Sequence, residues 1–181
     1  MRKVLTLTAL LGVLSGLVLY VQAAEPGWYH RLRYPLAYET IVRGHAENYR
    51  LDPELLAAVI YQESKFDAEA RSDAGAVGLM QLRPDTARGI ALRTGGAAFR
   101  VEDLTNPEIN VRYGSWYLRH LLDKYDDEEL ALAAFNAGQG NVDGWRREGK
   151  GIAFAETRHY VERVRELKGI YRDAYASELG Y

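Results

Sequence analysis

The chain contains 181 residues with a formal net charge of −2 at pH 7, 27% charged residues and no cysteine. This length is typical of one globular domain that can bury a core of its own. The absence of cysteine excludes disulfide bonds, a thiol nucleophile and thiolate metal ligands, and the charge balance provides no basic surface for a nucleic acid.

The N-terminal segment carries a targeting pattern. Arg2 and Lys3 precede an apolar run at residues 4–21, and Gln22 and two alanines follow at 22–24. The run exceeds the ~7–15 residues usual in a secretory signal and approaches the ~17–25 of a spanning helix. We therefore expect residues 1–24 to be a signal peptide or an N-terminal membrane anchor, with a buried core helix as a third interpretation. Either of the first two places the rest of the chain outside the cytoplasm, as a secreted, periplasmic or cell-envelope protein.

Residues 25–37 form a lead-in segment that is aromatic and basic between Trp28 and Pro35. This mixture suits a collar at a membrane interface next to an anchor. It is equally typical of a lead-in that packs on the following domain, which we place at residues 38–181.

Apolar residues of that domain recur at intervals of three and four, which predicts helices. Pro53 and Pro107 follow Asp52 and Asn106 as helix starts, and Gly138 is a helix stop. The acidic run at residues 126–129 is typical of a first helical turn. Helices are expected at residues 38–49, 51–64, 84–92, 106–123, 127–136 and 155–177, with short pieces around 141–147. No run indicates a strand, so the predicted fold class is all-α.

The long middle helix carries a wide stripe of large side chains. They lie at intervals of three and four, namely Ile109, Tyr113, Trp116, Tyr117 and His120. Such a stripe is typical of a helix face that packs in the core.

The helix expected at residues 51–64 places a carboxylate where the pattern calls for an apolar side chain. Val59 and Ile60 belong to its apolar stripe, and Glu63 falls in the same stripe one turn later. Burial and the negative end of the helix dipole both disfavour the ionised carboxyl, so both raise its pKa. A carboxyl that is protonated near neutral pH is what a general acid requires. The alternative is that the helix frays early and Glu63 points to water.

The residues after Glu63 are rich in glycine and other small residues, which suits a cleft wall lying close to a ligand. The segment resembles the first motif of the soluble lytic transglycosylases, a lysozyme-like family that cleaves peptidoglycan glycan strands. The matching residues are Glu63, Ser64, Ser72, the Gly-Leu-Met-Gln run at 78–81, and Pro84. Two further blocks of the family follow in order, at residues 133–138 with Trp145 downstream and at 152–161. The resemblance covers residues 51–164.

This resemblance implies a lysozyme-like helical domain with a catalytic cleft, the SLT domain. It implies cleavage of the MurNAc–GlcNAc β-1,4 bond with formation of 1,6-anhydromuramic acid ends, peptidoglycan strands as the partner, and no cofactor or metal. A single glutamate, here Glu63, acts as general acid and then as general base. The substrate-binding residues carried over from the motifs are Ser72, Met80, Gln81, Phe135, Asn136 and Glu156.

Some of these assignments have alternatives. Phe135 stands where many members of the family have tyrosine, which removes a hydroxyl that reaches the catalytic glutamate or the substrate. Ser72 and Gln81 are equally typical of loop capping, and Glu156 is favoured by the helix dipole alone at the start of the last helix.

Two other functions remain open. A hydrolytic muramidase on the same scaffold needs a positioned water and a second carboxylate, for which Asp67, Glu69 and Asp73 are candidates by sequence proximity. A non-catalytic peptidoglycan-binding module would use aromatic side chains to stack on sugars, although the presence of Glu63 argues against it. The four histidines are scattered without ligand spacing, so we expect no metal site.

Overall fold

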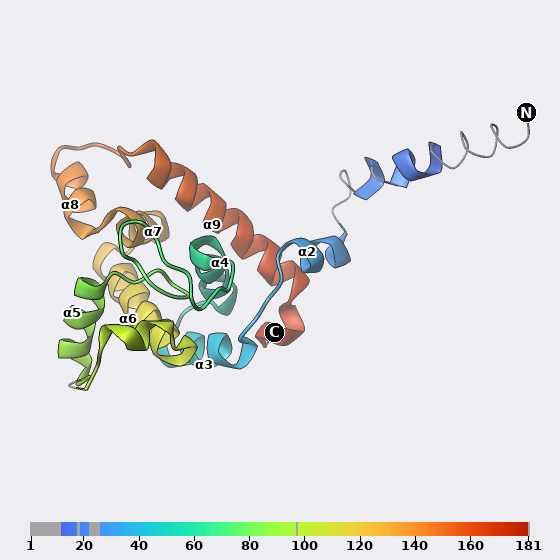
Figure 1. Cartoon of the computed structure of the whole chain (residues 1–181). Coiled ribbons are helices and arrows are strands. Elements are labelled where there is room, and N and C mark those ends of the chain that lie inside the picture. The colour runs from blue at the N-terminus through green and yellow to red at the C-terminus, as the bar shows by residue number, and fades with distance from the viewer. Residues whose placement is uncertain (1–11, 18, 22–25, 97, 181) are drawn as a thin grey trace, which may run out of the picture. The chain divides into compact units, whose positions relative to one another are not determined.

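The computed structural model in Figure 1 describes residues 12–17, 19–21, 26–96 and 98–180. The chain divides into two compact units, Met1–Pro35 and Leu36–Tyr181.

The first unit contains the helix α2, Gly27–Arg33. Its sequence shows no apolar periodicity, and the sequence analysis predicted no helix there. Basic residues in its last turn, Arg31 and Arg33 among them, complement the negative end of the helix dipole. Much of the expected signal or anchor segment, residues 1–11, 18 and 22–24, lies outside the described residues. Within the described part of the chain, no helix combines the length and the apolar character needed to cross a bilayer.

The second unit is helical, which confirms the predicted fold class. Its elements are α3 (Glu39–Tyr49), α4 (Pro53–Ser64), α5 (Pro84–Thr94), the 3-10 helix η1 (Val101–Thr105), α6 (Pro107–Tyr125), α7 (Glu128–Ala137), α8 (Gln139–Arg147), α9 (Ala155–Ala174) and α10 (Ala176–Leu179). Among the described residues β-pairing is limited to isolated bridges that join Arg71 to Val77 and Val77 to Leu82. The last predicted helix is interrupted at Tyr175, which leaves helical geometry and accepts a hydrogen bond from the Leu36 backbone N–H.

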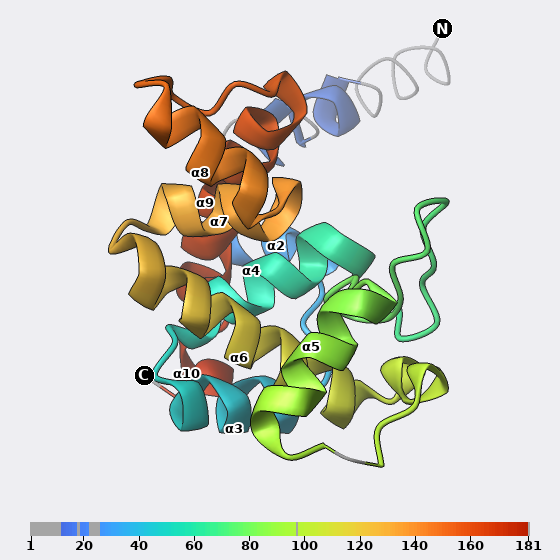
Figure 2. The same cartoon turned by 90° about the vertical axis from the view of Figure 1, so that its left-hand side faces the viewer.

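Helix α4 is the centre of this unit. It packs along α9 and against α3, and both views in Figures 1 and 2 show it between these helices. All residues from 54 to 61 are buried, so α4 has no exposed face where the sequence predicted a single apolar stripe. A helix that is apolar nearly all round is stable only when neighbours cover every side. Glu63 therefore lies in the last turn of a helix whose preceding residues are buried on all sides.

Helix α6 crosses the unit and packs against α3, α5 and α7. Asn106 caps it by accepting a hydrogen bond from the Ile109 N–H at 3.2 Å, and Pro107 occupies its first turn, as predicted. The aromatic stripe is only partly core, contrary to expectation. Tyr113 is buried, but Trp116 and Tyr117 are half-buried and His120 is exposed. The stripe is wider than the face that the neighbouring helices cover.

Helix α7 begins with the predicted acidic turn. Asp127 caps it by accepting from the Leu130 N–H at 2.9 Å, and Glu128 and Glu129 stand in its first turn. Gly138 ends the helix with φ +87°, a conformation that glycine adopts without strain. This stop fixes where the chain turns back after residues 135 and 136.

Candidate active site

Glu63 lies in the last turn of α4, and the helix does not fray before it. Lys65 and Phe66 take left-handed backbone angles and end the helix just beyond it. The Glu63 side chain is half-buried, and its Oε1 accepts a 2.7 Å hydrogen bond from the Tyr160 hydroxyl on α9. One carboxyl oxygen is thus held by the protein, while the group as a whole faces a cleft.

The environment of Glu63 favours its protonated form. Burial raises the pKa of Glu63 from 4.5 to about 7, and it outweighs the opposing effects of the Tyr160 hydrogen bond and the Lys65 charge. This confirms the pKa direction predicted from the sequence. Burial and the nearby Glu63 carboxylate raise the pKa of Tyr160 well above its ordinary value. The phenol therefore keeps its proton and is the donor in this pair.

The loop between α4 and α5 forms one wall of the cleft. The Ser64 hydroxyl donates to the Leu79 carbonyl at 2.8 Å, which ties the end of α4 to this loop. Asn110, completely buried on α6, accepts from the Met80 N–H and donates to the Val77 carbonyl. Gly78 has φ +80°, and a Cβ there would collide with the Asn110 side chain. Only glycine satisfies both requirements at this position.

Two predicted site residues in this loop also hold its shape. The Ser72 hydroxyl accepts from the Ala76 N–H at 3.0 Å, closing a tight turn. The Gln81 amide nitrogen donates to the carbonyls of Gly78 and Ala70, at 2.9 and 3.1 Å. The loop-capping role considered for Ser72 and Gln81 is therefore present, and both residues line the cleft as well.

The opposite wall comes from α6, α7 and the start of α9. The rings of Tyr117 and Phe135 lie 5.6 Å apart at an angle of 43°. The Asn136 side-chain oxygen accepts from the Thr157 hydroxyl at 2.8 Å, which joins the end of α7 to α9. Glu156 stands in the first turn of α9 and is exposed.

These walls enclose a cavity of about 560 Å³ that we call the catalytic cleft. Six of the seven predicted site residues line it, namely Glu63, Ser72, Gln81, Phe135, Asn136 and Glu156. Met80 does not line it. The Met80 side chain is completely buried and packs against Gly114 of α6, where a Cβ would collide with its sulfur. Met80 thus supports the loop from within the core and exposes no surface to a ligand in the cleft.

The sequence analysis did not predict several residues that belong to this site. Thr86 and Tyr117 line the cleft, and Tyr160 binds Glu63. Tyr160 lies one turn after Glu156, so helical spacing places the two on one side of α9. This helical spacing is the feature of the sequence from which Tyr160 could have been predicted as a site residue.

The carboxylates considered as a second catalytic group lie elsewhere. Asp67, Glu69 and Asp73 are exposed and do not line the cleft, and Asp67 instead accepts from the Glu69 backbone N–H at 2.9 Å. Within the cleft lining, Glu156 is the acid that accompanies Glu63. In the part of the chain that the structure describes, no cluster of three or more histidine, aspartate or glutamate side chains is arranged to hold a metal ion.

The helical fold and the cleft with a glutamate of raised pKa define a domain of the lysozyme-like class. A model of the family described as Transglycosylase SLT domain matches residues 40–157. The chain belongs to this family.

Several characterised relatives are similar to most of this chain. The soluble lytic murein transglycosylase of Salmonella typhimurium is 32% identical over 169 residues, which cover 85% of this chain and 26% of that protein. The membrane-bound lytic murein transglycosylase F of Alcanivorax borkumensis is 32% identical over 160 residues, covering 82% of this chain and 31% of that protein. The chain therefore spans about a quarter to a third of the length of these relatives.

Solved structures agree with this assignment. The lytic transglycosylase Slt of Pseudomonas aeruginosa, crystallised as an inactive Glu-to-Gln variant, superposes with a TM-score of 0.75 and 32% identity over 87% of this chain and 27% of that chain. The 70 kDa soluble lytic transglycosylase of Escherichia coli gives a TM-score of 0.75 and 29% identity over 80% of this chain and 25% of that chain.

Proposed function

We propose that this chain is a peptidoglycan lytic transglycosylase. It cleaves the MurNAc–GlcNAc β-1,4 bond and leaves 1,6-anhydromuramic acid ends, with Glu63 as its single general acid and base. The observation that carries the proposal is the Glu63 carboxyl, which lines an open cleft with a pKa of about 7. Family membership and the similarity to lytic murein transglycosylases support the same activity.

The Tyr160 contact fixes which carboxyl oxygen carries the proton. Because Glu63 Oε1 accepts the Tyr160 hydrogen bond, the proton of the neutral acid resides on Oε2. Glu63 Oε2 donates this proton to the glycosidic oxygen as the bond from that oxygen to the muramic acid C1 breaks. Tyr160 is a positioning residue in this scheme, because it acts through Glu63.

The second step returns Glu63 to its starting state. The Glu63 carboxylate accepts the proton of the muramic acid C6 hydroxyl while the C6 oxygen forms a bond to C1. No water is consumed, and the charge that develops at C1 is stabilised by the sugar's own N-acetyl group, which the polar residues of the cleft hold. Gln81, Asn136 and Glu156 are the proposed contacts, together with Ser72 and the Phe135 ring.

The positions of the other acids favour this scheme over hydrolysis. A retaining hydrolase needs its second carboxylate ~5–5.5 Å from the first. Asp67, Glu69 and Asp73 do not line the cleft, so Glu156 is the side chain on which a hydrolytic mechanism would depend.

The product ends test the proposal directly. Sacculi are digested with the purified chain or with Glu63→Gln, and the fragments are analysed by mass spectrometry. Anhydromuramyl ends, lighter than reducing ends by one water, are expected from the chain alone and not from the variant. Reducing muramic acid ends would establish a muramidase instead, and intact sacculi would leave a peptidoglycan-binding module.

The N-terminal segment completes the proposal. We propose that residues 1–24 export the domain, as a cleaved signal or as an anchor that associates with the membrane, and that the domain acts outside the cytoplasm at the cell envelope. Fusing residues 1–37 to a reporter enzyme that is active only after export tests this. Activity in the soluble periplasmic or culture fraction indicates a cleaved signal, activity in the membrane fraction indicates an anchor, and an inactive cytoplasmic fusion refutes export.

A further inference from the structure

The aromatic stripe of α6 continues beyond the catalytic cleft onto the protein surface. The rings of Trp116 and His120 stack with their centroids 5.3 Å apart and their planes within 7° of parallel. Trp116 is half-buried and His120 is exposed, so this stack stands outside the core. Aromatic side chains ordered in this way outside the core are typical components of a ligand site.

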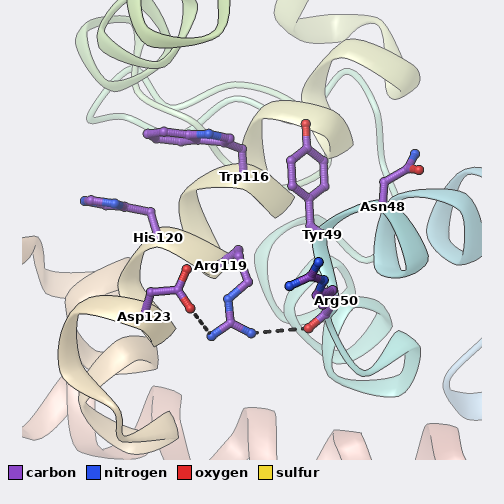
Figure 3. A pocket seen from close by; sticks show the side chains of 7 residues that line it. All are labelled: Asn48, Tyr49, Arg50, Trp116, Arg119, His120 and Asp123. Atoms are coloured by element: carbon purple, nitrogen blue, oxygen red, sulfur yellow. Dashed lines mark hydrogen bonds and ion pairs between the residues drawn. The ribbon is translucent and has the colours of Figure 1, made fainter.

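The stack forms one side of a hollow between α3 and α6. This α3–α6 hollow has a volume of about 550 Å³, and its aromatic and charged lining is formed by Tyr49, Arg50, Trp116, Arg119, His120 and Asp123. Figure 3 shows the parallel rings of Trp116 and His120 on one side and the Tyr49 ring with its hydroxyl on the other.

The polar groups of the hollow are held in place before any ligand arrives. The Arg119 guanidinium donates to the Arg50 carbonyl at 3.2 Å and pairs with the Asp123 carboxylate at 2.6 Å. The buried Arg119 Nε has no hydrogen-bond partner among the residues that the structure describes. An aromatic plate beside fixed donors and acceptors matches a sugar ring, which presents C–H groups on its faces and hydroxyl or acetamido groups at its rim.

The lining of the hollow is linked to that of the catalytic cleft through a third, smaller hollow. A connecting hollow of about 230 Å³ shares Thr86 and Tyr117 with the cleft, and it shares Trp116 and His120 with the α3–α6 hollow. The shared residues therefore place the three cavities in the order catalytic cleft, connecting hollow and α3–α6 hollow. A polymer that occupies the cleft and leaves it past Tyr117 meets the Trp116–His120 stack next.

We propose that the Trp116–His120 stack and the α3–α6 hollow bind the peptidoglycan glycan strand beyond the catalytic cleft, with one sugar ring lying on the aromatic stack. The identity of this ligand rests on the proposed function, since the strand is the polymer that the cleft would hold. The additional contact makes the enzyme prefer long strands, because short fragments fill the cleft without reaching Trp116.

Comparing two substrates isolates this contact. The full chain and Trp116→Ala are assayed on a muramyl tetrasaccharide and on long glycan strands from which the stem peptides have been removed. Losing the aromatic platform should raise KM for the long strands about tenfold and leave kcat and the tetrasaccharide kinetics unchanged. Trp116→Phe should restore much of the long-strand KM. Leu92→Ala, which removes an exposed apolar side chain of α5 outside these three cavities, is the matched control.

Equal kinetics of Trp116→Ala and the unmodified chain on long strands would overturn the inference. An equal loss on both substrates would overturn it too, because it would place Trp116 in the cleft or in the fold. If Trp116→Ala does not fold, as circular dichroism would show, the exposed His120→Ala takes its place with a smaller rise in long-strand KM, about threefold.

Binding in a catalytically inert background separates this inference from the proposed function. The chain with Glu63→Gln should bind stem-free long strands in a sedimentation assay, and adding Trp116→Ala should weaken binding about tenfold. A binding difference without any cleavage by the unmodified chain would sink the proposed function alone. Cleavage with unchanged long-strand binding, or binding that requires stem peptides, would sink this inference alone.

Discussion

Replacing Glu63 with glutamine should stabilise the protein at high pH. The Glu63 carboxyl has a pKa of about 7 in the fold against an ordinary 4.5, so the folded state holds the proton more tightly than the unfolded chain does. Between these two values the folded state binds more protons, and stability falls as pH rises. Glutamine keeps the shape and the acceptor for the Tyr160 hydroxyl, and it has no charge to desolvate.

The magnitude follows from the pKa difference. The interval from 4.5 to about 7 corresponds to about 3.4 kcal/mol, because one pKa unit corresponds to about 1.36 kcal/mol. Water in the open cleft screens part of the Glu63 charge, so we expect a gain of about 2 kcal/mol for Glu63→Gln near pH 8. The gain should vanish near pH 4, where both states of the unmodified chain are largely protonated at this site.

Urea unfolding followed by circular dichroism at a series of pH values measures this difference. Glu69→Gln, which removes an exposed carboxylate from the neighbouring loop, corrects for the change in net charge. A Glu63→Gln effect that is constant with pH, or that shrinks as pH rises, would refute the conclusion that burial of this carboxyl sets its pKa.

Three further predictions concern the same site. Tyr160→Phe removes a hydrogen bond that lowers the Glu63 pKa, so the alkaline limb of the pH–rate profile should move to higher pH; an unchanged limb would show that Tyr160 does not act on the catalytic proton. Gly78→Ala should lower the free energy of unfolding by about 3–5 kcal/mol, because it combines strain at positive φ with a collision at Asn110. Gly75→Ala, also at positive φ but with free space around it, should cost about 1–2 kcal/mol in the same denaturation experiment. Equal costs for the two variants would contradict the packing around Gly78. Glu156→Gln should lower kcat less than about tenfold and keep anhydro ends, whereas Glu63→Gln should lower kcat by about 10²–10⁴; a comparable loss in both variants would point to a hydrolytic pair.

The helix boundaries could be predicted because their signals are local. Pro53 and Pro107 open α4 and α6, and Gly138 closes α7, as expected from their own backbone preferences. Helix α2 and η1 escaped prediction since segments of seven and five residues carry too little apolar periodicity.

Contacts between distant segments limited the prediction of the site. Tyr160 meets Glu63 only because α9 packs along α4, a contact between residues 97 positions apart. Motif position predicted Met80 as a substrate contact, but its packing against Gly114 of α6 depends on how the loop folds over that helix. Helical spacing grouped Trp116 with Tyr113, and the spacing alone does not reveal where the covering helices stop.

Helix α6 also determines the spacing between the sites along its surface. It holds Asn110 under the cleft loop, Tyr117 in the cleft wall and Asp123 at the far end of the α3–α6 hollow. An α-helix of 19 residues is a rod of about 28 Å that neither stretches nor bends easily. Trp116 and Tyr117 are consecutive residues of this rod, so the proposed outer sugar position is held at a fixed place relative to the cleft wall. Inserting one residue after Tyr117 would rotate His120 and Asp123 by about 100° relative to Trp116 and would separate the two stacked rings.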